Sequence, residues 1–122
     1  MSGVMVDPGP VIPIDLIGPH ADCLRRPTVL RTTRPMEWGF GDIVTYRVYC
    51  PKCGLPQEGE PPSMAHPHVV TTARIGLGMG EEQAHDTRLG AMLSAICAWN
   101  LHYALQVVYP FRMSDLRKIL GV

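Results

Sequence analysis

A regular alternation of apolar and polar residues marks one segment near the middle of the chain as a β-strand. Within residues 42–49, Val44, Tyr46 and Val48 fall on one face, and the residues between them fall on the other. This period of two residues is typical of a strand with one buried face. Segments 28–34 and 68–75 are rich in β-branched residues and predict two further strands. We therefore expect a small antiparallel sheet.

The pattern changes after a glycine-rich break at residues 76–80. Residues 81–109 predict one long helix, because the segment begins with two glutamates, which favour a helix N-terminus, and Pro110 would end it. A short final helix is expected over residues 114–120, with Ser114 as its N-cap. The predicted fold class is therefore α+β.

The long helix is unusual because residues 89–111 contain no Asp, Glu, Lys or Arg. A surface helix would show a charged stripe, so we expect this one to be buried, either by the β module wrapped around it or partly by its own domain and partly by a partner subunit. The apolar arm favours the second. Leu89, Leu93 and Ile96 share a face and are the expected contact residues. Cys97 is interpreted as a small buried apolar residue. Polar residues in the C-terminal half argue against a membrane span.

Residues 1–27 form an arm in which prolines recur every few positions. Prolines at this density prevent a helix and favour an extended chain. The arm is nevertheless apolar, whereas a disordered linker is usually polar. We therefore expect a partner subunit to cover the arm, with contacts through Ile12, Ile14 and Ile17.

Length and charge narrow the classes of function. A chain of 122 residues suits one domain with a modest core. Its 11 basic and 11 acidic side chains cancel, so charge favours neither nucleic acid nor a membrane as partner. The N-terminus lacks the basic and apolar regions of a signal peptide, which predicts a location in the cytoplasm or in a virion.

The clearest chemical motif is the sequence Cys-Pro-Lys-Cys-Gly at residues 50–54. Two cysteines separated by two residues can offer two thiolates to one zinc ion. The proline favours the turn between them, and Gly54 can adopt the positive φ that directs backbone amides toward the sulfurs. The motif resembles the knuckle of zinc-ribbon proteins. That resemblance implies a β-hairpin module with zinc bound between two knuckles.

A second Cys-x-x-Cys is missing, and two pairs compete for the other half of the site. His20 and Cys23 precede the first predicted strand, which matches the order knuckle, strand, turn, strand, knuckle that the ribbon requires. His66 and His68 are the alternative, because residues two apart can share one face of a strand. Zinc favours thiolate, so the pair with Cys23 is preferred.

These patterns predict an extended arm over 1–27, a zinc-stabilised β module over 28–75, and helices over 81–122, all in one domain. The expected function is that of a non-enzymatic structural or interaction protein within a larger assembly. An excess of Arg over Lys, nine to two, with many Gly and Pro, is typical of a high-GC genome and suggests a bacteriophage virion as one such assembly.

The alternative function is that of a zinc-ribbon regulator that binds nucleic acid or acts in transcription. A local group of arginines near the first predicted strand motivates it: Arg25, Arg26, Arg31 and Arg34. Basic side chains close to the aromatic Trp38 and Phe40 could bind phosphates and stack on bases. The competing interpretation is a solvated sheet edge that arginines keep soluble.

Overall fold

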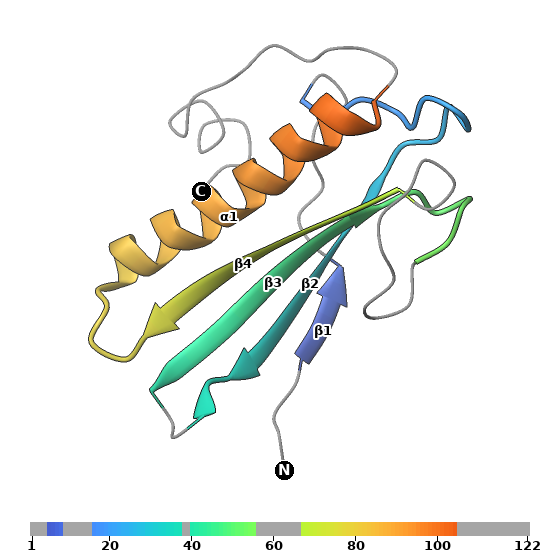
Figure 1. The fold of residues 1–122 in the computed structure, drawn as a ribbon. Helices are drawn as coiled ribbons and strands as arrows, with labels where there is room; N and C mark the ends of the chain where they lie inside the picture. Colours follow the sequence, from blue (N-terminus) through green and yellow to red (C-terminus); the bar gives the residue numbers. More distant parts are fainter. Residues whose placement is uncertain (1–4, 9–15, 38–39, 56–66, 105–122) are drawn as a thin grey trace.

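The computed structural model describes residues 5–8, 16–37, 40–55 and 67–104 (Figure 1). It has the predicted α+β fold. Four strands precede one helix: β1 (Met5–Pro8), β2 (Thr28–Pro35), β3 (Gly41–Tyr49), β4 (His68–Gly76) and α1 (Glu81–His102). The strands form one antiparallel sheet in the order β1-β2-β3-β4, and α1 lies along one face of it over β4 and β3 (Figure 1).

The buried face of the sheet is the one that the alternation in β3 predicted. Val44, Tyr46 and Val48 are all buried, whereas the residues between them are partly exposed. The register places Val29 of β2 opposite Val48, and Ala73 of β4 opposite Val44, so apolar side chains from three strands meet beneath α1. The three predicted strands are confirmed to within one residue at each end.

The N-terminal arm packs on its own chain, which the sequence did not predict. Residues 5–8 form the edge strand β1 beside β2. Leu16 and Ile17 are buried in the core with the apolar face of α1. Ile17 was expected to contact a partner subunit, but it is only 1% exposed because the chain itself covers it. Ile12 and Ile14 lie outside the described residues.

Helix α1 ends at His102, seven residues earlier than the sequence predicted. The backbone turns away there because the Tyr103 carbonyl accepts a hydrogen bond from the Ala21 N–H at 2.9 Å, and Ala104 forms a β-bridge with His20. The arm therefore captures the chain as it leaves the helix. The predicted final helix over 114–120 lies outside the described residues.

The apolar face of α1 is covered mainly by its own sheet. Leu89 and Ile96 are buried in the core and Leu93 packs against it, so the chain already covers much of the predicted subunit contact. Cys97 is exposed, which corrects the expectation that it is buried, because it projects about 100° around the helix from Ile96. Within the described residues, no helix combines the length and hydropathy needed to cross a membrane.

Candidate metal centre

The candidate site lies at one end of the β2–β3 hairpin, where two loops leave the sheet together. Thr28 pairs with Tyr49, so the chain before β2 and the chain after β3 emerge side by side. The first loop contains His20 and Cys23, and the second contains Cys50 and Cys53. Antiparallel pairing thus brings together two short motifs that lie about 30 residues apart.

The two loops have the same backbone conformation. In the first, the Leu24 N–H donates to the His20 carbonyl at 2.8 Å, and in the second the Gly54 N–H donates to the Cys50 carbonyl at 3.0 Å. The fifth residue of each loop has a positive φ, 57° at Leu24 and 89° at Gly54. The His-x-x-Cys segment is therefore a second knuckle, even though it lacks the glycine of the first.

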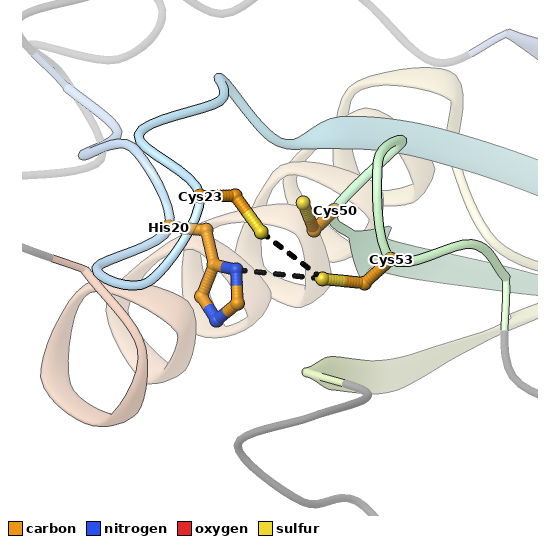
Figure 2. Close-up of side chains that lie close together, drawn as sticks. All are labelled: His20, Cys23, Cys50 and Cys53. Atoms are coloured by element: carbon orange, nitrogen blue, oxygen red, sulfur yellow. Dashed lines mark hydrogen bonds between the residues drawn. The ribbon is translucent and has the colours of Figure 1, made fainter.

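Four side chains converge between the knuckles (Figure 2). The Cys23 and Cys53 sulfurs are 3.3 Å apart, and the Cys53 sulfur lies 3.7 Å from His20 Nδ1. All four candidate ligand atoms, including the Cys50 sulfur, lie within 4.8 Å of one another. Tetrahedral zinc with ordinary bond lengths would place such atoms about 3.5–3.8 Å apart. The cluster could therefore hold a metal ion with little movement.

The thiols are reduced and crowded. All three cysteines of the cluster are free, and the 3.3 Å separation exceeds the roughly 2.05 Å of a disulfide bond. Burial, together with the contacts that the thiol makes with Cys23 and Cys50, raises the pKa of Cys53 to about 12. Burial is the largest single influence on the pKa of Cys50 and acts to raise it, but hydrogen bonds from the Cys53 and Lys52 backbone and from the Cys53 and Cys23 side chains together lower that pKa overall.

These opposite pKa shifts mean that one thiol of the cluster loses its proton readily, whereas a second thiolate beside the first is unfavourable. A bound cation would remove that unfavourable effect, because it replaces the thiol protons and stabilises every thiolate. Three thiolates with one imidazole are a donor set that suits zinc and other borderline or soft metals. The residues therefore fit a metal in chemistry as well as in spacing.

The four candidate ligands differ in burial, and each knuckle contributes one buried and one partly exposed residue. His20 and Cys50 are completely buried, whereas Cys23 and Cys53 are partly exposed. The His20 ring presents Nδ1 to the thiols and lies 6.0 Å from the Trp99 ring, centre to centre. Its Nε2 is buried without a hydrogen-bond partner among the described residues. The ring is therefore held by packing and by the knuckle backbone.

Helix α1 fixes the segment that leads into the first knuckle. Asn100 accepts a hydrogen bond from the Gly18 N–H and donates one to the Leu16 carbonyl, both at 2.9 Å. The Trp99 indole N–H donates to the Gly18 carbonyl, also at 2.9 Å. All these residues are buried. We call Trp99 and Asn100 the helix clamp, because together they bind the backbone two and four residues before His20.

Sequence reasoning missed the helix clamp. Asn100 was noticed only as a polar residue that argues against a membrane span. A more useful signal was available, because an amide beside a tryptophan in an otherwise uncharged helix needs buried hydrogen-bond partners. The backbone N–H and C=O groups of the apolar arm could have been predicted as these hydrogen-bond partners.

The two competing half-sites are now distinguished by position. His20 and Cys23 join Cys50 and Cys53 in the cluster. His68 is the first residue of β4, opposite Tyr49 in the sheet, and the cluster does not include it. His66 lies outside the described residues. The arrangement knuckle, strand, turn, strand, knuckle that the sequence suggested is present.

The four arginines of the nucleic-acid hypothesis do not share one surface. Arg25 and Arg26 are exposed beside the first knuckle, whereas Arg34 is exposed at the opposite end of β2. Six residues of strand separate Arg34 from Thr28, which is about 20 Å. Arg31 lies opposite Tyr46, on the face that α1 covers. The group is compact in sequence but divided in space.

Comparison with known protein families, with curated proteins and with solved structures finds no match to this chain. The resemblance to zinc ribbons therefore rests on the knuckle sequence and on the geometry of the four ligands.

The knuckles provide a matched pair of stability predictions. Leu24→Gly should stabilise the protein by about 0.5–1 kcal/mol, because it relieves a positive φ at a side chain that is 64% exposed. Gly54→Ala should destabilise it by about 1 kcal/mol, because alanine disfavours the positive φ at this position. A Cβ there would contact no atom within 4 Å, so the backbone conformation alone accounts for this cost. Urea unfolding of the metal-loaded variants measures both, and shifts of equal sign would contradict the shared conformation.

Proposed function

We propose that this protein is a non-enzymatic structural protein that binds other protein subunits, and that one zinc ion held by His20, Cys23, Cys50 and Cys53 fastens its fold. The observation that carries the proposal is the meeting of four ligand atoms within 4.8 Å at the junction of two knuckles. Such an ion would link the arm to the hairpin. Because the helix clamp binds the same arm, the metal and α1 would hold it from both sides.

The number of ligands favours a structural role over a catalytic one. Structural zinc sites have four protein ligands, whereas catalytic sites leave one position open for water or substrate. Here the chain offers three thiols and one imidazole, which fill a tetrahedron. Two of the four ligands are completely buried. We therefore assign the metal to stability, and we assign no reaction to it.

The remaining surface supports an interaction role. Several large apolar side chains are exposed, among them Phe40 (66%), Leu77 (77%) and Leu101 (80%). The chain has no net charge that would attract a polyanion. Its small size also makes a metal staple useful, since a chain of this length has a limited apolar core. Protein partners are the class that such a surface serves best.

Metal content and metal removal test the proposal. Native mass spectrometry of the purified protein should find one zinc ion per chain. A strong chelator should lower Tm by about 20 °C or more, because structural zinc contributes many kcal/mol to folding. Cobalt(II) should restore the fold and magnesium should not, since magnesium prefers oxygen ligands. A protein that carries no metal after expression with added zinc, and whose Tm ignores the chelator, would refute the zinc assignment.

A further inference from the structure

The sheet has two edges, and they differ in how well they are protected against pairing with another strand. One edge is β1, which has only four residues and includes an aspartate and a proline in its sequence. Short length, charge and proline are features that keep an edge strand from recruiting a new neighbour. The opposite edge, β4, is longer, has no proline and carries a single charged side chain.

Strand β4 is nine residues long and is rich in β-branched residues. Among the described strands, β3 is its only neighbour. It contains no proline, lysine or acidic residue, and Arg74 is its one charged side chain. Val70 is 46% exposed, and Thr72 and Arg74 are exposed on the same face. A long edge with a single charge and no proline is a site for strand addition.

We infer that β4 pairs with β4 of a second copy of this chain, so that two sheets join into one across a two-fold axis. The inference rests on the proposed role in protein assembly and specifies its first partner. In an antiparallel pair related by such an axis, each residue meets its counterpart on the same face of the sheet. Full overlap of His68–Gly76 with its copy places Thr72 at the axis, opposite the partner's Thr72.

This register is self-complementary. On the helix side of the sheet, Val69 would meet the partner's Ile75, and both side chains are only partly buried in the single chain. On the other side, Val70 would meet the partner's Arg74. The only charge in the strand therefore does not face its own copy. Apolar cross-strand pairs stabilise a sheet, and like charges opposite each other destabilise it.

The position of α1 is compatible with such a pair. The helix packs on β4 and β3 and runs along β4 (Figure 1), so its axis lies above these two strands. With strands about 4.8 Å apart and each helix axis midway between its own β3 and β4, two-fold pairing would put the two helix axes about 10 Å apart. Helices in direct contact pack at about 8–10 Å. The second helix would therefore touch the first without overlapping it.

The flank of α1 that lies over β4 is lined with small residues. The Thr71 hydroxyl donates a hydrogen bond to the Ala91 carbonyl at 2.6 Å, which identifies this flank. Of the alanines on it, Ala91 and Ala98 are partly exposed, whereas Ala84 and Ala95 are already buried by the chain itself. Because Thr71 lies next to the axis at Thr72, the two helices would approach most closely near Ala91. Alanines permit that approach.

Opposite charges at one exposed position test the inference. Val70→Lys would place a lysine opposite the partner's Arg74 twice in each dimer, whereas Val70→Glu would place a glutamate there. The zinc-loaded wild type should be a dimer by light scattering and sedimentation at micromolar concentration. The Kd of the dimer should be at least about tenfold lower for the Glu variant than for the Lys variant, and added salt should reduce this difference in Kd. Adding Arg74→Glu to Val70→Lys should restore the dimer.

Each result decides one question, because zinc is measured in the same samples. A wild type that binds zinc and remains a monomer overturns the pairing but not the metal site. A dimer without zinc overturns the metal site but not the pairing. If the Lys and Glu variants dimerise equally, or if a larger assembly keeps its mass in the Lys variant, the contact lies elsewhere and the inference is wrong. Circular dichroism confirms that each variant is folded.

Discussion

Cys50→Ser should lose its metal and most of its stability. Cys50 is completely buried at the end of β3, and serine is a poor zinc ligand at neutral pH. Structural zinc contributes about 10–16 kcal/mol in small domains, or about 2.5–4 kcal/mol for each of four ligands, which corresponds to about 70- to 900-fold in affinity. A competition assay with a chelating dye measures the affinity. Thermal unfolding should show a much lower Tm.

Cys97→Ser is the matched control. It makes the same chemical change at a cysteine that is exposed on α1 and lies outside the cluster. Its zinc content and Tm should equal those of the wild type. If Cys50→Ser retained one tightly bound zinc, the ion would be held by other residues, and the four-ligand site would be wrong. Equal losses in both variants would point to a general effect of thiol removal.

Asn100→Leu should cost about 2–6 kcal/mol of the free energy of unfolding. Leucine has the same branched shape as asparagine, but it leaves the Gly18 N–H and the Leu16 carbonyl buried without partners. Each orphaned buried group costs about 1–3 kcal/mol. Because these groups lie just before His20, zinc affinity should also fall by about 10–100-fold, as it does when groups that orient a ligand are removed. Urea unfolding and metal competition measure the two effects.

Gln83→Leu is the control for the amide. It replaces an exposed amide on the first turns of the same helix and should change stability by less than about 0.5 kcal/mol. Zinc affinity should not change. If Asn100→Leu lowered stability but left zinc affinity intact, the helix clamp would support the core without positioning the first knuckle.

The strands could be predicted from the sequence because their signal is local. Alternation in β3 identifies the buried face directly, and the β-branched segments on either side identify its two neighbours. The glycine-rich break and the glutamates locate the start of α1 correctly. The end of α1 was misplaced, because it depends on a hydrogen bond from Ala21, which lies more than 80 residues earlier in the chain.

Half of the candidate site could be recognised from the sequence, and the other half could only be ranked. Cys50 and Cys53 form a motif with its own turn chemistry, whereas His20 and Cys23 lack the glycine that usually marks a knuckle. Leu24 adopts the required positive φ instead. Leucine rarely does so, because its Cβ then approaches the following carbonyl oxygen. No local pattern would have predicted that conformation.

The arm illustrates the limit more generally. Within the described part of the arm, residues 5–8 form an extended strand, and Leu16 and Ile17 are buried, whereas Met5 and Val6 are exposed. Which surface buries Leu16 and Ile17 depends on Trp99 and Asn100, at the far end of the sequence. A covering partner was inferred because local reasoning could not see that the chain returns to cover Leu16 and Ile17 itself.

The metal site and the helix clamp, which both hold the first knuckle in place, also differ in when they can form during synthesis. Every candidate metal ligand has been translated by Cys53, and the sulfurs of Cys23 and Cys53 are 30 residues apart, whereas the bond from Asn100 to Leu16 spans 84. Closing the shorter loop costs about 0.9 kcal/mol less in chain entropy. A nascent chain can therefore capture its metal while α1 is still inside the ribosome. Helix α1 then packs onto a β2–β3 hairpin whose two knuckles the metal already links.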